Sequence, residues 1–439
     1  MPDVVLCLDV GSTFTKGAAV DVGSGVLLGT AEHPTTSDTD VLIGMDAVAA
    51  ALGLGAEVPV LACSSAGGGL RLAVVGYERE ISAEAGRRVA LSAGARVVHV
   101  SAGPLDAAGT RDLAAASPDV VLLVGGTDGG EESVLMHNAA ALASARPTVP
   151  VVLAGNRAVR GAAAALLTGR GRVVLPTANV LPDIGTIEPG PARATIRRVF
   201  LEHVIGGKAL SRGPRFARLV RAVTPDAVLD GVALLGSLLR AADPGARGVV
   251  VVDVGGATTD VYSALTPEEA ASAVAPLWDR RTVEGDLGMR WSATSLVAAA
   301  EAERLDVEGL AEPARRRAAS VGLLPDGAGE READERLAAL AAVIALRRHV
   351  RAESAYDEGS VSAAGATLVV LSGGVFRHLD PAARERVVAV LRADRGGARA
   401  VLDRARVVVD DDYLLAPAGL LRDRHPAAAA GLLSGLLAG

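Results

Sequence analysis

The chain has 439 residues, of which 50% are hydrophobic and only 2% aromatic, and its formal net charge is −7. This length predicts about two to three domains, with cores of alanine, valine and leucine that suit closely packed layers of strands and helices. The negative charge argues against a surface whose main function is to bind nucleic acid. We therefore expect α/β domains that have no nucleic-acid partner.

The two cysteines and seven histidines lack the spacing of a metal site. Cys7 and Cys63 each lie in an apolar, strand-like run, which favours buried small side chains over redox or ligand roles. The N-terminus lacks the basic and apolar regions of a signal peptide. The apolar run at residues 427–439 is too short for a membrane helix, which takes roughly 20 residues, so a packed terminal helix is favoured. We expect a soluble, cytoplasmic protein with no membrane partner.

An acid-tipped hairpin opens the chain. Residues 4–8 predict a buried strand that ends at Asp9, and residues 18–22 predict a returning strand. The turn between them is rich in small and hydroxyl residues, and Lys16 follows it. The N–H and O–H groups of such a turn can donate hydrogen bonds to a phosphate, and an acid at the strand end can hold a hydrated Mg²⁺. Taken alone, the pattern fits an ordinary tight hairpin equally well.

The next segments predict a strand at residues 26–33, a helix at residues 38–51 and a strand at residues 58–63. Three strands, a helix and a strand are the start of a ribonuclease H-like fold. The glycine cluster at residues 67–69 favours a flexible turn, and a site-lining loop is the alternative.

From about residue 70 to residue 174 the pattern alternates between strand and helix, which predicts βαβ units around a parallel sheet. The expected strands are residues 97–100, 120–124, 151–154 and 173–175, and the expected helices are residues 83–93, 106–116, 131–145 and 156–168. The loop at residues 125–130 follows a strand, where α/β sheets place ligands, but it lacks the G-x-G-x-x-G spacing. A tight turn is favoured there, and a grip on a partner or a second ligand is the alternative.

Residues 176–191 form a linker rich in proline and glycine, and a basic helix is expected at residues 192–203. Residues 206–209 faintly resemble a P-loop but fail the motif, because the first glycine and the final serine or threonine are missing. An apolar helix is expected at residues 225–239.

Residues 248–262 repeat the design of the opening hairpin. DVGSTFTK at residues 9–16 and DVGGATTD at residues 253–260 each place an aspartate, a glycine turn and hydroxyl residues between two strands. An internal repeat predicts two similar domains. Two acid-tipped hairpins that face one another can clasp a polyphosphate from both sides, so the repeat favours the phosphate-binding interpretation of both.

The rest of the second half predicts further strands and helices. Residues 284–291 are expected to form a loop near a cleft, the charged residues 304–335 a solvated surface with loops, and residues 336–351 an amphipathic helix. Residues 366–376 predict a strand, two glycines and the start of a helix. The glycines would let an adenine and ribose lie directly against the backbone. A helix at residues 381–393 and a strand at residues 405–409 follow. The small residues at 414–420 suit close helix packing between lobes.

Three of these segments, DVGSTFTK, DVGGATTD and LVVLSGGVF at residues 368–376, resemble the phosphate-1, phosphate-2 and adenosine motifs of the actin/Hsp70/sugar-kinase ATPase superfamily. The resemblance implies an α/β protein with two ribonuclease H-like domains and a nucleotide in the cleft between them. The first domain is expected at residues 1–245, with an α/β insertion at about residues 70–190, and the second at residues 246–439.

Within that superfamily the chain resembles the MutL/GlmL family, the accessory proteins of cobalamin-dependent glutamate mutase. The resemblance lies in DVGSTFTK and in four further segments at residues 63–76, 121–132, 176–189 and 414–421. The family is thought to act as an ATP-dependent reactivating chaperone that exchanges damaged cobalamin from its mutase. The resemblance therefore implies ATP or ADP and Mg²⁺ as cofactors, and one or more mutase subunits as the partner.

The resemblance also implies roles for individual residues. Asp9 and Asp253 would hold Mg²⁺ through water, and Asp260 would brace the second hairpin or polarise water. The catalytic step would be the attack of water on the γ-phosphate. An acid from the linker would orient this water, and Asp183 and Glu188 are the candidates. The residues implied in nucleotide contact are Gly11, Ser12, Thr13, Thr15 and Lys16 on the first hairpin, Gly255, Gly256, Ala257, Thr258 and Thr259 on the second, and Gly373, Gly374 and Val375 at the adenosine.

Three functions are compatible with this pattern, and a chaperone-type ATPase for a cobalamin enzyme is favoured. A small-molecule kinase of the same fold would carry a base aimed at an acceptor hydroxyl, for which the loop at residues 126–130 is a weak candidate. A nucleotide-dependent, actin-like assembly protein would polymerise when ATP is added.

Overall fold

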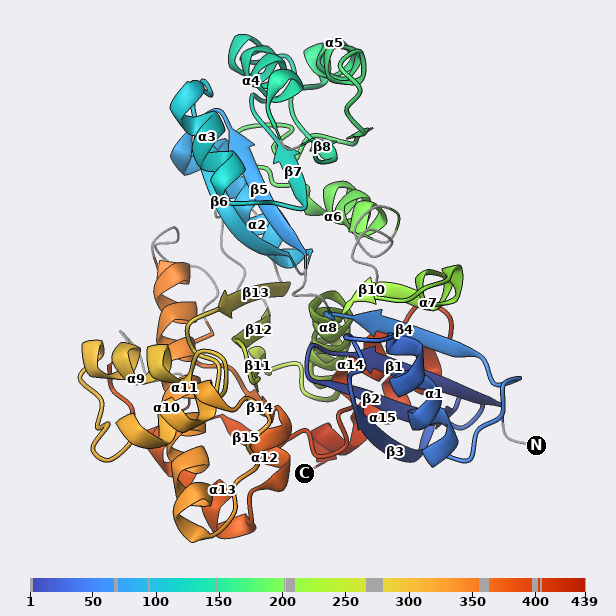
Figure 1. Cartoon of the computed structure of the whole chain (residues 1–439), viewed down its shortest axis with the longest axis vertical. Helices are drawn as coiled ribbons and strands as arrows, with labels where there is room; N and C mark the ends of the chain where they lie inside the picture. Colours follow the sequence, from blue (N-terminus) through green and yellow to red (C-terminus); the bar gives the residue numbers. More distant parts are fainter. Residues whose placement is uncertain are drawn as a thin grey trace.

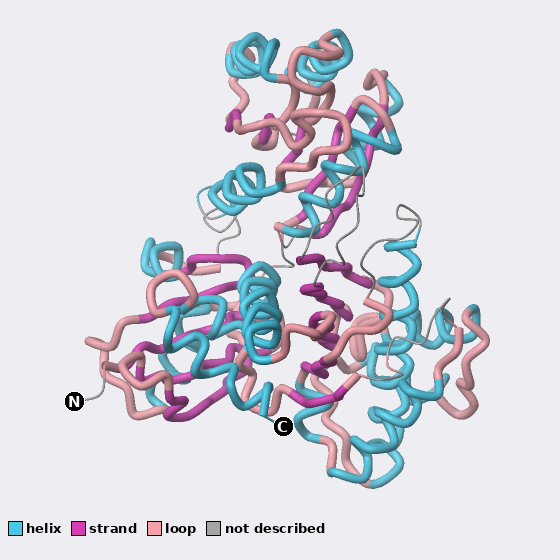
Figure 2. Tube along the Cα trace, turned by 180° about the vertical axis from the view of Figure 1, so that it is seen from behind, coloured by secondary structure: helices cyan, strands magenta, loops and turns pink. Residues whose placement is uncertain are grey.

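The computed structural model describes residues 3–66, 70–93, 95–146, 148–200, 202, 210–265, 279–354, 363–396, 402 and 405–438. These residues form three five-stranded sheets with helices packed on them (Figures 1 and 2). Two of the sheets lie side by side in two lobes, and the third stands above them at the top of Figure 1. The glycine cluster at residues 67–69 and the segment at residues 206–209 lie outside the described residues.

The sheets of the two lobes have the same topology. In the first the strands lie in the order β3-β2-β1-β4-β10, and in the second β13-β12-β11-β14-β15. The first is built from β1 (Val4–Val10), β2 (Phe14–Asp21), β3 (Val26–Pro34), β4 (Val60–Ser64) and β10 (Val220–Val223), and the second from β11 (Gly248–Val254), β12 (Thr259–Leu265), β13 (Asp279–Glu284), β14 (Leu368–Ser372) and β15 (Arg406–Val409).

In each of these sheets the first three strands pair antiparallel, and the last two pair parallel. Counted from its own first strand, each sheet has the order 3-2-1-4-5. This shared order confirms the prediction of an α/β protein with two ribonuclease H-like domains.

The third sheet is entirely parallel and has the order β6-β5-β7-β8-β9, which confirms the predicted βαβ insertion. The exact domain boundaries stay a prediction. The insertion contains β5 (Arg71–Gly76), β6 (Arg96–Ala102), β7 (Val120–Leu123), β8 (Val151–Leu153) and β9 (Val174–Pro176), together with η1 (Arg79–Ala83), α2 (Glu84–Ser92), α3 (Ala107–Ala115), α4 (Ser133–Ser144), α5 (Arg157–Thr168) and α6 (Pro189–Val199).

Three helices pack between the two lobes: α8 (Thr224–Ala242), α14 (Leu415–Leu421) and α15 (Pro426–Ala438). Their apolar side chains share one cluster with residues of β1 and β11, so the sheets of both lobes rest on them. Helices α8 and α14 approach so closely that a Cβ at Gly419 would lie 1.8 Å from the Ala227 carbonyl oxygen. The close packing that the small residues at 414–420 predicted is confirmed.

The expectation of a solvated surface with loops at residues 304–335 is confirmed in part: most of these residues are exposed or half-buried, but helices replace much of the expected loop. Two helices, α10 (Ala311–Ala319) and α11 (Ala328–Ser354), occupy this region. Their charges are partly internal, because Arg317 is fully buried and its Nε donates to Asp334 Oδ1 at 2.6 Å. Charge composition alone predicted solvent exposure because it does not reveal that oppositely charged side chains pair inside a fold.

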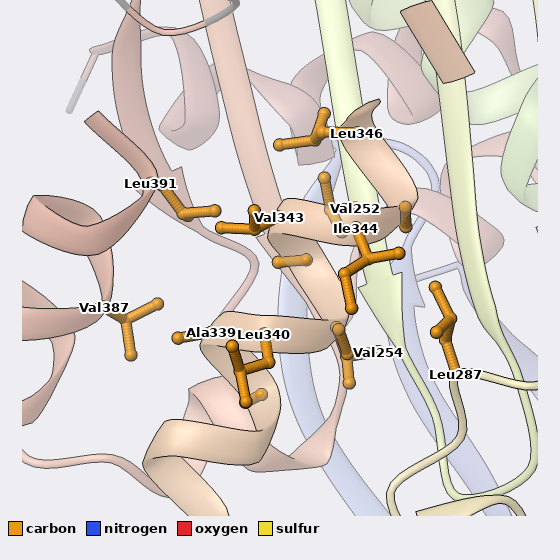
Figure 3. Packing of buried hydrophobic residues seen from close by; sticks show 14 of the residues in the cluster. Val252, Val254, Leu287, Ala339, Leu340, Val343, Ile344, Leu346, Val387 and Leu391 are labelled. Carbon is orange, nitrogen blue, oxygen red and sulfur yellow. The ribbon is translucent and has the colours of Figure 1, made fainter. Parts of the chain in front are cut away.

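Helix α11 is also more deeply buried than the amphipathic helix that the sequence predicted. Every residue from 337 to 346 is buried, so the helix is covered on all sides at its centre. Figure 3 shows Val343 and Ile344 of α11 in one cluster with Val252 of β11 and Leu391. The remaining helices are α1 (Val41–Ala51) and α7 (Pro214–Leu219) in the first lobe, and α9 (Ala293–Ala302), α12 (Gly374–His378) and α13 (Pro381–Ala393) in the second. None of the described helices is long and apolar enough to cross a membrane.

We predict that Gly419→Ala destabilises the protein, because the added methyl group would overlap the backbone of α8. Overpacking of this kind costs about 1–3 kcal/mol. The matched control is Gly435→Ala on α15, where a Cβ would meet nothing within 4 Å and the helix would gain about 0.5–1 kcal/mol. Thermal unfolding measures both variants. A Gly419→Ala variant as stable as the control would contradict the close contact.

Candidate functional site

The two acid-tipped hairpins have the same backbone geometry. In the first, Gly11 N–H donates to the Phe14 carbonyl at 3.0 Å, and in the second, Gly255 N–H donates to the Thr258 carbonyl at 2.9 Å. A Cβ at Gly11 would lie 2.7 Å from that Phe14 oxygen, and a Cβ at Gly255 would lie 3.0 Å from the Thr258 oxygen. Both turns therefore use glycine for the same reason, because no larger residue fits so tight a loop.

The structure brings the two hairpins together. A Cβ at Gly256 of the second loop would lie 3.9 Å from the Thr13 hydroxyl oxygen of the first. The strand register places Asp9 opposite Lys16 in the first hairpin and Asp253 opposite Asp260 in the second. Ser12 and Thr13 are exposed at the tip of the first loop. The four charged side chains thus stand at the bases of two loops that face one another.

The Asp9 carboxylate is buried and accepts three hydrogen bonds. Its Oδ1 accepts from the Thr224 hydroxyl at the first residue of α8 and from the Cys63 thiol on β4 at 3.5 Å. Its Oδ2 accepts from the Tyr413 hydroxyl at 2.6 Å. The sequence identified Asp9 but none of these donors in this role. Cys63 is buried, as predicted, and it also contacts the site.

Burial and neighbouring charges shift the acidity of Asp253. The pKa of this carboxyl is raised to about 6, first by burial and then by the charges of Asp260 and Asp9, while Lys16 opposes the shift. Asp410, at the end of β15, has a pKa that burial likewise raises to about 6, and the Asp253 charge adds to the effect. Burial thus disfavours the charged form of both acids, and a cation beside them would stabilise it.

Asp260 is held by hydrogen bonds from Arg281 and Thr258. Its Oδ1 accepts from Arg281 Nε at 3.0 Å and from Nη2 at 2.7 Å, and both side chains are buried. Its Oδ2 accepts from the Thr258 hydroxyl at 3.3 Å. Of the two roles that the resemblance implied for Asp260, this geometry favours bracing over the polarisation of water.

Two residues that were predicted to contact phosphate, Thr15 and Thr259, lie beneath the loops. The Thr15 side chain is fully buried, with its Oγ1 3.1 Å from Thr35 Oγ1. The Thr259 hydroxyl is also buried and donates to the Leu287 carbonyl at 2.7 Å. Because side chains alternate across a strand, these two hydroxyls hold the hairpins in place and do not face the opposite loop. Ala257 packs against Gly288, and a Cβ on Gly288 would lie 2.3 Å from the Ala257 carbonyl.

The two glycines that were predicted to face the adenosine, Gly373 and Gly374, differ in their surroundings. Gly373 has φ +113°, and a Cβ there would lie 2.3 Å from the Val254 carbonyl oxygen, so this glycine serves the close approach of two strands. Gly374 begins α12 and is partly exposed, with Arg377 Nη2 3.9 Å from the position of its Cβ. Val375 packs against the core of the second lobe.

A cavity of about 260 Å³ lies next to Asp9, between the first sheet, α12 and α14. The Tyr413 ring lines it, with Lys16 Nζ 3.9 Å and Arg377 Cζ 5.5 Å from the ring centroid. Arg377 Nη2 also lies 3.5 Å from Glu32 Oε2 on β3, which links the two lobes. Sequence reasoning missed Tyr413 and Arg377, although the aspartate run at residues 410–412 marks the segment.

The linker candidates for orienting water lie away from the hairpins. Asp183 pairs through its backbone with Thr186, and Glu188 precedes α6, so both belong to the insertion. The chain enters the interlobe helix α8 through β10 instead, and there Thr224 contacts Asp9. The acid in this first turn, Asp226, is buried against Arg197 and is not free to orient water.

The residues present fit a hydrated Mg²⁺ with a polyphosphate. Among the described residues, no group of three or more His, Cys, Asp and Glu side chains could hold a metal ion by itself. Mg²⁺ commonly keeps several waters and binds through one or two carboxylates together with phosphate oxygens. Asp9 and Asp253 could supply those carboxylates, and Lys16 and the loop N–H groups could donate to phosphate.

Comparisons with known proteins identify relatives. The family model described as "MutL protein" matches residues 5–437. The "Protein MutL" of Clostridium tetanomorphum is 36% identical over 404 residues, which cover 86% of this chain and 87% of that protein.

Solved structures are matched at low scores. Nucleotide-free acetone carboxylase is matched at a TM-score of 0.38 and 14% identity, over 95% of this chain and 70% of that chain. An activator of 2-hydroxyisocaproyl-CoA dehydratase from Clostridium difficile, with bound ADPNP, is matched at 0.32 and 11% identity, over 97% and 95%. These scores are too low to add to the sheet order as evidence for the fold.

We predict that Asp253→Asn stabilises the protein in the absence of ligands, more at high pH than at low pH. Because the folded-state pKa of Asp253 is raised, its contribution to stability is lost as the pH rises from about 4 to about 6. Removing the charge should add on the order of 2 kcal/mol near pH 8 and about half of that near pH 5.

Thermal unfolding at the two pH values measures the effect, with Asp423→Asn as the control because Asp423 is an exposed carboxylate. The control should change the stability little, because it replaces an exposed surface side chain. An Asp253→Asn variant that is destabilised near pH 8 would show that the charged form of this carboxylate is not disfavoured in the folded protein.

Proposed function

The chain belongs to the MutL protein family, and from this premise we propose that it is an Mg²⁺-dependent ATPase that serves a cobalamin-dependent mutase. The proposal has two parts, nucleotide hydrolysis in the interlobe cleft and reactivation of the mutase by exchange of damaged cobalamin. One observation carries the first part: two equivalent acid-tipped hairpins, one from each lobe, face each other across the cleft.

In this proposal the chain's residues position the phosphates and the cation's waters. Bound Mg²⁺ would neutralise charge on the β- and γ-phosphates. Lys16, Ser12 and Thr13 donate to phosphate oxygens from the first lobe, and backbone N–H groups of the second loop donate from the other side. Asp9 and Asp253 would accept hydrogen bonds from the waters of a bound Mg²⁺. Asp260, fixed by Arg281, keeps the second loop in its conformation.

The conformational part of the proposal is rotation of the lobes about α8 and α14. ATP and ADP would favour different closures because only ATP presents a γ-phosphate to both loops. The insertion would follow this motion. Arg197 of α6 pairs with Asp226 in the first turn of α8, two residues from Thr224, and Arg193 Nη1 lies 3.0 Å from Asp279 Oδ2 on β13.

The mutase part of the proposal rests on the family segments. Two of them, at residues 121–132 and 176–189, meet at the carboxyl edge of the insertion sheet. Asp128 N–H donates to the Pro182 carbonyl at 3.0 Å, and Asn179 Nδ2 donates to the Gly126 carbonyl at 2.9 Å. We place the contact with a mutase subunit at this edge, because it holds the loop that the sequence offered for gripping a partner.

We predict that Asp9→Ala and Asp253→Ala each lower Mg²⁺-dependent ATP hydrolysis on the order of 100-fold or more, since each removes one side of the cation's support. Release of inorganic phosphate measures the rate. Asp183→Ala is the matched control, because it removes a carboxylate that lies in the insertion, and it should hydrolyse ATP at the wild-type rate. Unchanged hydrolysis in both cleft variants would exclude the cleft as the site.

We predict that inactivated cobalamin-dependent mutase regains activity when it is mixed with this protein, free cobalamin and ATP. Asp253→Ala should give no recovery, because reactivation requires the nucleotide cycle. Mutase turnover measures the outcome. Wild-type protein that hydrolyses ATP without restoring its mutase would contradict the chaperone role. Hydrolysis that requires a small acceptor would support a kinase instead, and ATP-dependent sedimentation of the protein would support an assembly protein.

A further inference from the structure

Tyr413 occupies a position that the nucleotide motifs do not account for. It follows β15 of the second lobe and immediately precedes the α14 region, yet its hydroxyl donates to Asp9 of the first lobe at 2.6 Å. The two residues are 404 positions apart in the chain. We propose that Tyr413 is a positioning residue that orients the Asp9 carboxylate for the waters of Mg²⁺ and makes this orientation depend on the arrangement of the lobes. This inference rests on the proposed function.

The hydrogen-bonding capacity of the carboxylate shows what Tyr413 does. An ionised carboxylate offers about four acceptor positions, two on each oxygen. Asp9 Oδ1 already accepts from Thr224 and Cys63, so both of its positions are taken. Oδ2 accepts from Tyr413 and retains one position. The three donors therefore fix both the plane of the carboxylate and the single direction in which it can accept from a metal-bound water.

The Tyr413 side chain is itself held in place. Only 8% of the residue is exposed, and its ring contacts two cations, with Lys16 Nζ 3.9 Å and Arg377 Cζ 5.5 Å from the centroid. Such contacts stabilise by cation–π attraction. Arg377 in turn reaches Glu32 across the lobes at 3.5 Å. The ring cannot turn away from Asp9 without breaking these contacts.

The backbone at Tyr413 is unusual for a side chain of this size. Its φ of +56° lies in the left-handed region, which few residues other than glycine adopt. The neighbouring Asp410 side chain accepts from Leu414 N–H at 2.7 Å and so fixes the turn into α14. A sterically costly conformation that is held by several contacts is common at functional sites. Here it aims the phenol at Asp9.

The position of Tyr413 couples the cation site to lobe closure. Asp9 and Lys16 belong to the first lobe, whereas Arg377 belongs to the second, and Tyr413 lies on the segment that joins the second sheet to α14. Rotation of the second lobe moves Arg377 and β15 relative to Asp9. In this proposal such a rotation would change the contacts that hold the Tyr413 ring, and with them the aim of the Asp9 carboxylate.

The test is the affinity of Tyr413→Phe for ADP, measured by calorimetric titration with Mg²⁺ and again with a chelator. The phenylalanine keeps the ring and its cation contacts and removes only the hydroxyl. With Mg²⁺ the affinity should fall about tenfold, the scale of one hydrogen bond to a charged group. Without Mg²⁺ it should equal that of the wild type. Tyr77→Phe in the insertion makes the same chemical change away from the cleft and should alter neither value.

A double-mutant cycle separates an effect through Asp9 from a general structural effect. In an Asp9→Asn background, Tyr413→Phe should add no further loss of Mg²⁺-dependent affinity, whereas a general defect would add the same loss again. Thermal unfolding without ligand confirms that the variants are folded. If Tyr413→Phe lowered the affinity for ADP equally with and without Mg²⁺, the proposed role of Tyr413 would be wrong. The same conclusion would follow if the affinity did not fall while the wild type binds Mg²⁺-ADP, and in both cases the proposed function would stand. A wild type that binds no nucleotide would overturn the proposed function and this inference with it.

Discussion

Two carboxylates from different lobes, Asp9 and Asp253, lie at the bases of the facing hairpins, and the cost of burying their charge is the constraint on which the site depends. Burial disfavours the charged form of Asp253 most, the charges of Asp260 and Asp9 add to this effect, and together they raise its pKa. Lys16 offsets part of it, and the donors around Asp9 stabilise that charge locally. A cation and a polyphosphate would offset the remaining cost of burying the two acids.

The same constraint gives the interlobe helices their importance. Asp9 and Asp253 come from different lobes, and α8 and α14 fix how the lobes are arranged through backbone contacts that only glycine allows, at Gly231 and Gly419. The first turn of α8 contacts both the first hairpin and the insertion. Thr224 contacts Asp9, while Asp226 pairs with Arg197 of the insertion. A change in the cleft therefore has a short physical route to the insertion.

The sequence was sufficient for features that depend on local pattern. The repeat of DVGSTFTK in DVGGATTD predicted two equivalent hairpins, and the alternation of strand and helix predicted the parallel insertion. Contacts between distant segments were beyond local pattern, so Tyr413, Thr224 and Arg377 were missed. Strand alternation could have shown that Thr15 and Thr259 face inward, because each lies at the same register position of its hairpin. The buried Arg317 pair could not have been seen, because composition does not reveal pairing.

The most direct measurement of the two-sided clamp is the proton release that accompanies binding of preformed Mg²⁺-ADP near pH 6. Calorimetry in buffers of different ionisation enthalpy measures it. Because Asp253 is about half protonated there and must be charged beside a cation, the wild type should release about half a proton more than Asp253→Asn. Equal proton release from the two proteins, with the wild type binding the nucleotide, would contradict a cation held between Asp9 and Asp253.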